Sequence, residues 1–300
     1  MTPSAEPAVS VVIPAWNAAW CVGRAIDSVL AQDFADREIV VVNDGSTDDT
    51  AGVLAGYGDA IRVVTQANGG MSSARNAGIR ATRGHYLAFL DADDRWLPGK
   101  LGRQMALMAQ RPELAFCAAT ARFEDPEGKP AGMWACSGKP DAGVADIFAH
   151  HATVAGGASS VLARRELVQQ LGGFDETLFG AEDTDLWVRL AALGPFACIA
   201  DPLVVVLKRP GSVSRNRERM RAGAIAMTKK NRGLLPAALQ GCFWRDVYAG
   251  TLCDYAKWAY RDGERGRALR DLASALRLAP RTRGRLVASL ALAMLRGQAL

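Results

Sequence analysis

The chain has 300 residues and a mass of 32.0 kDa, which allows one large domain or two modest ones. Hydrophobic residues make up 49% and charged residues 22% of the chain, and this composition excludes a largely disordered protein. The charge is unevenly divided, because residues 1–206 hold 16 Lys/Arg and 25 Asp/Glu whereas residues 207–300 hold 20 and 6. The acidic part suits a cation, and the basic part suits phosphate, an anionic membrane or nucleic acid.

Short β-branched segments alternate with helical patterns over the first 95 residues. We expect strands at 9–14, 38–43, 61–65 and 86–90, and helices at 21–31, about 47–54 and 71–81. Ser46 or Thr47 is the expected N-cap of the second helix. Because these strands are apolar throughout, they predict a parallel sheet covered on both faces. Ligands of such sheets bind beyond the carboxyl ends of the strands, where Asn17, Asp44 and Asp91 fall.

The later elements are less regular. We expect a helix from Pro98 to about 109, a strand at 114–123, an irregular segment at 124–141, and strands at 159–162 and 203–207. Residues 215–300 are rich in Ala, Leu and Arg and predict helices broken near 233–236 and 280. The six cysteines lack C-x-x-C spacing, which argues against a zinc ribbon or a dithiol motif and favours reduced thiols.

An acidic segment, Asp91-Ala-Asp93-Asp94, directly follows the strand at 86–90. Its carboxylates repel one another, and a divalent cation such as Mg²⁺ or Mn²⁺ would relieve that repulsion. The alternative interpretation is a solvated turn before the next helix.

Three further segments carry polar groups suited to a nucleotide. Asp44 ends a strand and could accept hydrogen bonds from a base, although an Asx turn is the simpler interpretation. Arg75 follows a glycine-rich loop and could reach a diphosphate, or it could be solvated. Glu182 and Asp183 open a helix, where one could act as a general base or both could simply cap the helix. The chain contains neither a dinucleotide fingerprint nor a P-loop.

Taken together and in order, these motifs resemble the family 2 glycosyltransferases. The segments that carry the resemblance are V-V-I-P-A-W-N (11–17), V-V-N-D-G-S-T-D (41–48), A-R-N-A-G-I (74–79), A-F-L-D-A-D-D (88–94), G-G-F-D-E (172–176) and E-D-T-D-L-W (182–187). The resemblance covers about residues 8–215 and implies an α/β fold of GT-A type, with a mostly parallel central sheet and helices on both faces. It implies a catalytic domain at 1–214, with a Rossmann-like nucleotide-sugar half at about 8–95 and an acceptor half at 96–214. The composition of residues 215–300 adds a helical, basic C-terminal extension.

The resemblance assigns roles to individual residues. Pro14 and Asn17 lie where the first strand meets the nucleotide, Asp44 reads the base, and Arg75 lines the nucleotide pocket. Asp91 faces the ribose or the metal's waters, and Asp93 ligates Mn²⁺ or Mg²⁺. Asp183 is the catalytic base, and Glu182 and Trp187 lie on the acceptor side. The implied reaction moves a sugar from a nucleoside-diphosphate sugar, with UDP expected as the nucleotide, to an acceptor hydroxyl with inversion.

One departure concerns the metal. Arg209 stands where the family often has a metal-binding histidine, and a guanidinium stays protonated and cannot ligate a metal. Either another group completes the coordination, or Arg209 contacts the diphosphate directly. His85 and the pair at 150–151 do not match the position.

The basic C-terminal segment bears on the expected cellular location. A basic amphipathic helix at 281–297 could lie on an anionic bilayer or could pack on the catalytic domain. We expect a cytoplasmic protein, peripheral on the cytoplasmic membrane face, with a glycan or lipid-linked acceptor and no nucleic-acid partner. Cell-surface glycan synthesis in a bacterium is the expected setting. The competing hypothesis is a catalytically inactive nucleotide-sugar-binding or scaffold protein on the same fold.

Overall fold

The computed structural model describes residues 6–136, 142–149, 154, 157–209 and 216–298. The chain divides into two compact units, Met1–Thr177 with Glu182–Pro210, and Leu178–Ala181 with Gly211–Leu300. Residues 178–181 thus belong with the helices rather than with the sheet, a division finer than the single boundary expected after residue 214. Within the helical unit, a Cβ at Gly223 would lie 2.1 Å from the Phe179 carbonyl oxygen, so a glycine is needed for this close approach.

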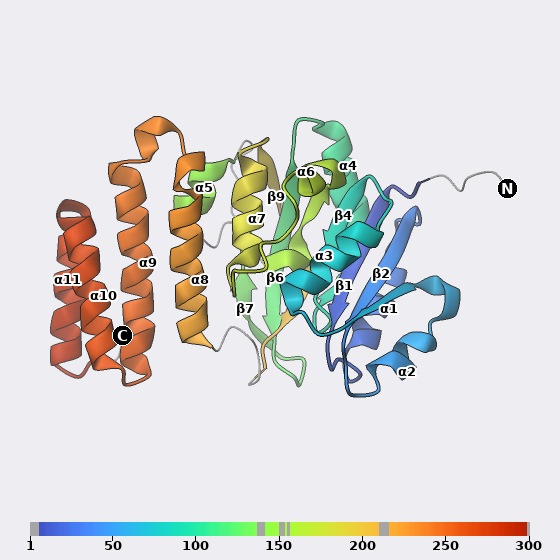
Figure 1. The fold of residues 1–300 in the computed structure, drawn as a ribbon, viewed down its shortest axis with the longest axis horizontal. Coiled ribbons are helices and arrows are strands. Elements are labelled where there is room, and N and C mark those ends of the chain that lie inside the picture. Colours follow the sequence, from blue (N-terminus) through green and yellow to red (C-terminus); the bar gives the residue numbers. More distant parts are fainter. Residues whose placement is uncertain (1–5, 137–141, 150–153, 155–156, 210–215, 299–300) are drawn as a thin grey trace. The chain divides into compact units, whose positions relative to one another are not determined.

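The first half of the sheet is parallel, as expected (Figure 1). Its strands lie in the order β3-β2-β1-β4, with bounds β1 Val9–Ala15, β2 Arg37–Asp44, β3 Arg62–Gln66 and β4 Tyr86–Phe89. Every residue of β1 is buried, so both faces of the sheet are covered there. By contrast, β3 lies at the edge and is largely exposed.

The helices of this half follow the expected positions closely, at α1 Val22–Leu30, α2 Thr50–Ala55 and α3 Met71–Ala81, with a 3₁₀ turn η1 at Gly58–Ala60. A Cβ at Gly78 would lie 2.3 Å from the Val12 side chain, so glycine lets α3 lie close against β1. The expected N-cap was wrong, because Asp49 occupies the cap position of α2. Ser46 and Thr47 instead contact the loop that follows β1.

The second half of the sheet mixes strand directions. It comprises β5 Arg95–Trp96, β6 Phe116–Glu124, β7 Pro130–Trp134, β8 Leu162–Arg164 and β9 Phe196–Leu207. The strand β6 runs parallel to β9, whereas β8, β7 and β5 join antiparallel. The parallel pairing expected for the sheet therefore holds for β1–β4 and for β6 with β9.

Three expectations for this half need correction. The segment at 124–141, expected to be irregular, contains β7. The strand expected at 159–162 is instead a 3₁₀ turn, η2 Gly157–Ser160, followed by β8. The strand expected at 203–207 is the end of the longer β9. The helices are α4 Lys100–Gln110, α5 Val144–Ala149, α6 Arg165–Gln170 and α7 Glu182–Ala191.

A disulfide joins Cys136 to Cys198, 62 residues apart in sequence. Cys198 lies in β9, and Cys136 follows β7, where its backbone N–H donates to the Thr120 hydroxyl. Sequence spacing did not predict this pair, because the fold brings together two thiols that are distant along the chain. Their expected reduced state is corrected accordingly.

The helical unit packs through small residues. Its elements are α8 Arg217–Lys230, η4 Asn231–Leu234, η5 Ala237–Leu239, α9 Cys242–Arg261, α10 Arg265–Leu278 and α11 Pro280–Leu295. Ala249 and Ala256 of α9 and Ala268 and Ala275 of α10 are fully buried in one cluster, so these helices approach closely (Figure 1). Within the described residues, no helix combines the length and hydropathy that crossing a bilayer requires.

Candidate functional site

The loop after β1 is tied to the loop after β2 through Asn17. Its backbone adopts φ +47°, a left-handed conformation uncommon for a residue with a side chain. The Asn17 amide oxygen accepts from the Thr47 backbone N–H at 2.8 Å, and its own N–H donates to the Ser46 hydroxyl at 3.0 Å. Pro14 is buried in β1, and the pairing of β1 with β4 ends two residues earlier, at Val12. The N–H that proline lacks is therefore not needed for a hydrogen bond to β4. Both predicted residues therefore shape the strand end.

Asp44 organises the glycine-rich loop. Its side chain is buried, and its carboxylate accepts from the Gln66 amide at 2.7 Å and from the Gly69 and Gly70 backbone N–H groups, each at 2.9 Å. Gly70 has φ +85°, a conformation that favours glycine. The carboxylate expected to read a base is thus engaged by donors of its own chain.

Arg75 joins two acidic motifs that are far apart in sequence. Its guanidinium is almost completely buried and lies 2.6 Å from Asp91 and 3.5 Å from Glu182. It also stacks 5.2 Å from the centre of the Phe174 ring. Burial by itself would lower the pKa of Arg75, but the charges of Asp91 and Glu182 raise it above its ordinary value.

Two polar atoms of this network lack a hydrogen-bond partner among the described residues. They are Arg75 Nε and Glu182 Oε2, and both are buried. Buried polar atoms are normally satisfied, so these atoms mark a place where a polar ligand could complete the network.

Asp183 lies at the start of α7 beside Glu182. Its Oδ1 accepts from the Thr184 backbone N–H at 2.6 Å, and a Cβ at Gly157 would approach its Oδ2 to 3.0 Å. Burial and the charge of Glu182 raise the pKa of Asp183 to about 6, against the opposing effect of Arg75. A carboxylate with this pKa is ionised at neutral pH and is a stronger base than an ordinary aspartate.

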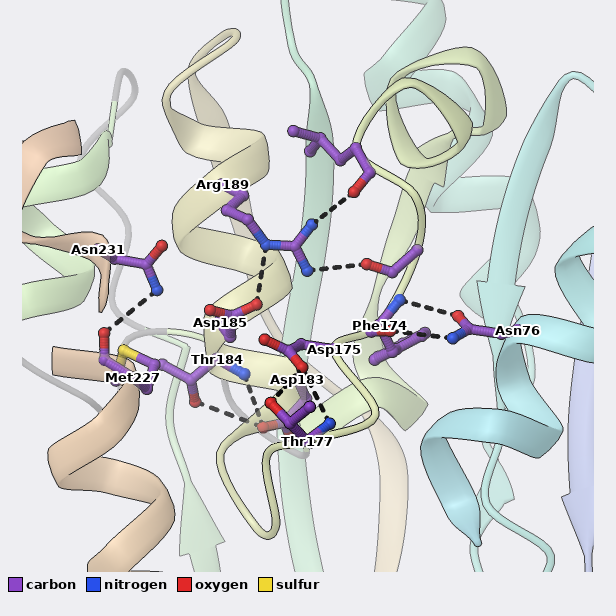
Figure 2. Close-up of polar contacts among 12 residues, drawn as sticks. Asn76, Phe174, Asp175, Thr177, Asp183, Thr184, Asp185, Arg189, Met227 and Asn231 are labelled. Carbon is purple, nitrogen blue, oxygen red and sulfur yellow. Dashed lines mark hydrogen bonds and ion pairs between the residues drawn. The ribbon is translucent and has the colours of Figure 1, made fainter. Parts of the chain in front are cut away.

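The neighbouring Asp185 has a different environment (Figure 2). It is fully buried and pairs at 2.8 Å with Arg189, which also donates to the Leu171 and Gly173 carbonyls. This arrangement anchors α7 to the preceding loop. Asp185 is therefore structural, which leaves Asp183 as the candidate base.

The acidic segment after β4 is held by partners on several elements. Asp93 lies 3.2 Å from the guanidinium of Arg209. The buried Asp94 accepts from the Ser159 hydroxyl at 2.6 Å and from the Leu207 N–H at 3.2 Å. Burial, followed by the charge of Asp91, raises the pKa of Asp93 above its ordinary value, although Arg209 opposes this.

These contacts bear on the expected metal. Asp91 is paired with Arg75, Asp93 with Arg209, and Asp94 with neutral donors. Among the described residues, no three His, Cys, Asp or Glu side chains form a cluster that could hold a metal ion. The side chains present therefore do not fit a protein-built metal site. His85 is exposed away from this segment, and the histidines at 150–151 lie outside the described residues.

Trp187 was expected on the acceptor side, and the structure places it in the core instead. It is 1% exposed and packs against Phe89, Phe116 and Phe174. Its ring is therefore unavailable to a sugar. The apolar periodicity of α7 was the signal that could have placed it inside.

Sequence reasoning also missed positioning residues. Asn76 donates to the Phe174 carbonyl and accepts from the Phe174 N–H (Figure 2). It also donates to the Glu176 carboxylate. It thereby fixes the loop that carries the ring stacked on Arg75. Ser159 bridges Asp91 and Asp94, a contact between segments about 65 residues apart that no local pattern reveals.

The sequence of the chain matches a known protein family. Residues 10–165 match the model of glycosyl transferase family 2. An uncharacterised glycosyltransferase of Rickettsia prowazekii is 34% identical over 194 residues, which are 61% of this chain and 58% of that protein. The chondroitin synthase of Pasteurella multocida is 32% identical over 196 residues, 63% of this chain and 19% of that protein. The chain thus spans only part of the length of these curated relatives.

Solved structures share the fold at low identity. The S. aureus TarS structure in complex with UDP-GlcNAc has a TM-score of 0.69 at 18% identity, covering 91% of this chain and 81% of that chain. A mannosyltransferase from Pyrobaculum calidifontis in complex with GDP-Man and Mn²⁺ has a TM-score of 0.60 at 21% identity, covering 97% and 82%. The expected α/β fold of GT-A type is confirmed. Because the family model spans more than half of the chain and its matched range includes Asp44, Arg75 and the acidic segment Asp91–Asp94, the chain belongs to glycosyl transferase family 2.

Proposed function

We propose that the protein transfers a sugar from a nucleoside-diphosphate sugar to an acceptor hydroxyl with inversion, using Asp183 as the general base. The observation that carries the proposal is the network in which Arg75 joins Asp91 to Glu182, next to an Asp183 whose pKa is raised to about 6. A buried carboxylate with a raised pKa beside specific charged partners is typical of functional sites.

In this mechanism, Asp183 accepts the proton of the acceptor hydroxyl as that oxygen attacks the anomeric carbon. The new C–O bond forms on one face while the bond to the diphosphate breaks on the opposite face, and the electron pair leaves with the diphosphate. The transition state is oxocarbenium-like. Because displacement occurs once, the anomeric centre is inverted and no covalent enzyme intermediate forms. No step is assigned to a metal ion, because Asp91 and Asp93, the carboxylates expected to hold it, are each paired with an arginine.

Glu182 and Arg75 set the electrostatic environment of the proposed base, Asp183. The unpartnered Glu182 Oε2 could accept a hydrogen bond from a sugar hydroxyl, and its negative charge keeps Asp183 basic. The positive charge of Arg75 lies between Asp91 and Glu182, and it opposes, without cancelling, the rise in the pKa of Asp183. This division explains why one arginine is buried among several acids.

For the donor, we propose a UDP-sugar, supported by the fold shared with the UDP-GlcNAc complex of TarS. The GDP-Man complex of the Pyrobaculum enzyme makes GDP-sugars the second candidates. Chondroitin and hyaluronan synthases among the relatives support a role in bacterial surface polysaccharide synthesis.

The test is release of nucleoside diphosphate from UDP-GlcNAc and GDP-Man, with and without a panel of hydroxyl acceptors. D183N should lower kcat about 10²- to 10⁴-fold while donor binding persists. D201N is the matched control, because Asp201 is an exposed carboxylate in a surface ion pair with Arg103. Donor binding without turnover, in wild type and D183N alike, would favour the inactive scaffold.

For the helical unit, we propose contact with an anionic membrane that carries a lipid-linked acceptor. Residues 265–298 contain eight arginines and one acidic residue, Asp271, and that carboxylate is buried and paired with Arg221. Four leucines of α10 and α11 are exposed among these arginines: Leu269, Leu276, Leu292 and Leu295. Exposed apolar residues with arginines are typical of interfacial helices.

Co-sedimentation with vesicles tests this contact. Binding should require anionic lipid, weaken in high salt, and fall in L292S/L295S, while nucleotide binding is unchanged. Equal binding to neutral vesicles would contradict the proposal. The location on the cytoplasmic face belongs to the same proposal and is tested by cell fractionation.

A further inference from the structure

The carboxylates after β4 lie among cationic side chains supplied by the chain itself. Asp91 and Asp93 face Arg75 and Arg209 respectively, at 2.6 Å and 3.2 Å. These are the positions at which the sequence predicted a metal ion, and the described residues provide no cluster of ligands for one.

We propose that Arg209 is the built-in cation of the donor site, so that the nucleoside diphosphate binds without a divalent metal. The inference rests on the proposed function, because it names how that site neutralises the leaving group. It makes Arg209 a binding residue for the diphosphate and Asp93 the residue that positions it.

The position of Arg209 is fixed from two sides. Its Nε donates to Asp93, and its guanidinium carbon lies 5.0 Å from the centre of the Trp20 ring. Trp20 belongs to the loop between β1 and α1, and Asp93 follows β4. Both segments lie beyond the carboxyl ends of parallel strands, where ligands of such sheets bind. An ion pair and an aromatic contact together orient the guanidinium before any ligand arrives.

The charge and exposure of Arg209 suit a diphosphate. Its side chain is 36% exposed, whereas that of Arg75 is 2% exposed and already engaged by Asp91 and Glu182, so Arg209 is the more accessible of the two arginines to an anion. A guanidinium carries five N–H donors in a planar fork that matches two phosphate oxygens. It also keeps its charge at every physiological pH, as a leaving group that accumulates negative charge requires.

The same contacts disfavour a metal ion. A divalent cation at Asp93 would lie against the positive charge of Arg209, or would have to displace it from both Asp93 and Trp20. Asp94 is already held by Ser159 and the Leu207 N–H, so it is not a ready replacement ligand. Removing the guanidinium should therefore create a metal requirement that the wild type lacks.

Isothermal titration of the full chain with UDP and with GDP, in EDTA and in Mn²⁺, tests the inference without relying on turnover. We expect wild-type dissociation constants for the nucleotide that binds to agree within about threefold in the two buffers. R209A and R209H should weaken binding in EDTA at least about tenfold, as expected for loss of a charge-assisted contact. R209H should recover most of this loss in Mn²⁺, because a histidine beside Asp93 can ligate the ion.

A direct measurement of the metal accompanies the titration. In the presence of the nucleotide, the electron paramagnetic resonance signal of Mn²⁺ should report bound ion with R209H and free ion with wild type. R103A is the control variant, because Arg103 is an exposed arginine in a surface ion pair with Asp201. Circular dichroism establishes that each variant is folded.

The outcomes separate the two proposals. If wild type binds nucleotide only in Mn²⁺, or R209A binds as tightly as wild type in EDTA, the role of Arg209 is overturned and the proposed function stands. If neither nucleotide binds in either buffer, both proposals are overturned. Binding in EDTA that depends on Arg209 supports both.

Discussion

A lysine buried in the sheet domain gives a stability prediction that needs no substrate. Lys100, at the start of α4, is 0% exposed. Its ammonium lies 2.7 Å from the Gln104 amide oxygen and 3.9 Å from the centre of the Trp96 ring. Burial lowers the pKa of Lys100 from 10.5 to about 7. In the unfolded chain the lysine keeps its ordinary pKa, so folding must remove a proton or bury a charge.

The magnitude follows from this difference in pKa. Each pKa unit corresponds to about 1.4 kcal/mol, so the drop to about 7 costs roughly 5 kcal/mol of folding free energy at pH values below 7. K100M removes that cost and keeps an unbranched side chain of similar length. It also removes a hydrogen bond and a cation–π contact and leaves the Gln104 oxygen without its donor, losses of about 2–4 kcal/mol together. We expect K100M to be stabilised by about 1–3 kcal/mol at pH 6.5.

The sign of the pH dependence is specific. Between pH 7 and 10.5 the unfolded state of the wild type binds more protons than the folded state, so wild-type stability rises with pH, by up to about 1.4 kcal/mol per unit. The advantage of K100M should therefore shrink between pH 7 and pH 10 and reverse near the upper end. Urea unfolding followed by tryptophan fluorescence at pH 6.5, 8 and 9.5 measures it.

The control is K129M, which removes an exposed lysine from the β6–β7 turn. It should change stability little and by the same amount at each pH. The reasoning is refuted if K100M is less stable than wild type at pH 6.5, or if its difference from wild type does not vary with pH.

Three other predictions concern the site and its support. Because the pKa of Asp183 is raised to about 6, the transfer rate should fall as the pH falls through 6 and be about tenfold lower at pH 5 than at pH 8. E182Q removes the negative charge beside Asp183, so the pH at which the rate is half-maximal should move downward in a pH–rate profile. R75M removes the buried guanidinium that pairs with the half-buried Asp91 and Glu182. It should lower stability by about 2–4 kcal/mol, measured by urea unfolding. A loss of activity at unchanged stability would argue against this structural role. W187A should destabilise by about 3–5 kcal/mol through a core cavity while the folded fraction keeps its nucleotide affinity, and a selective loss of affinity would return Trp187 to the ligand site.

Local sequence signals predicted most of the first half of the fold. The helix at 71–81 and the strands that became β1, β2 and β4 were found within one or two residues, because each has a strong periodicity bounded by turn residues. The second half was harder. The strand β8 has three residues and β5 has two, and pairing with neighbours distant in sequence, rather than intrinsic propensity, makes them strands.

The site divides in the same way. Motif order identified Arg75, Asp91 and Asp183 as site residues, and the structure joins Arg75 directly to Asp91. Motifs did not predict that Arg209 would pair with Asp93, because that contact joins residues 116 positions apart. Trp187 shows the opposite error, since a residue next to a functional motif can belong entirely to the core.

The Cys136–Cys198 bond closes a covalent ring that contains part of the candidate site. The span of 62 residues between the two cysteines includes Ser159, Glu182 and Asp183, so the candidate base and the residue that bridges the acidic segment lie inside one closed loop. Closing a loop of this length reduces the entropy of the unfolded chain by an amount equivalent to about 4 kcal/mol. None of the contacts described for Asp183 or Ser159 involves either sulfur. A thiol reductant should consequently shorten the lifetime of the folded protein at elevated temperature while leaving kcat unchanged. The disulfide would then contribute to kinetic stability and not to the transfer reaction.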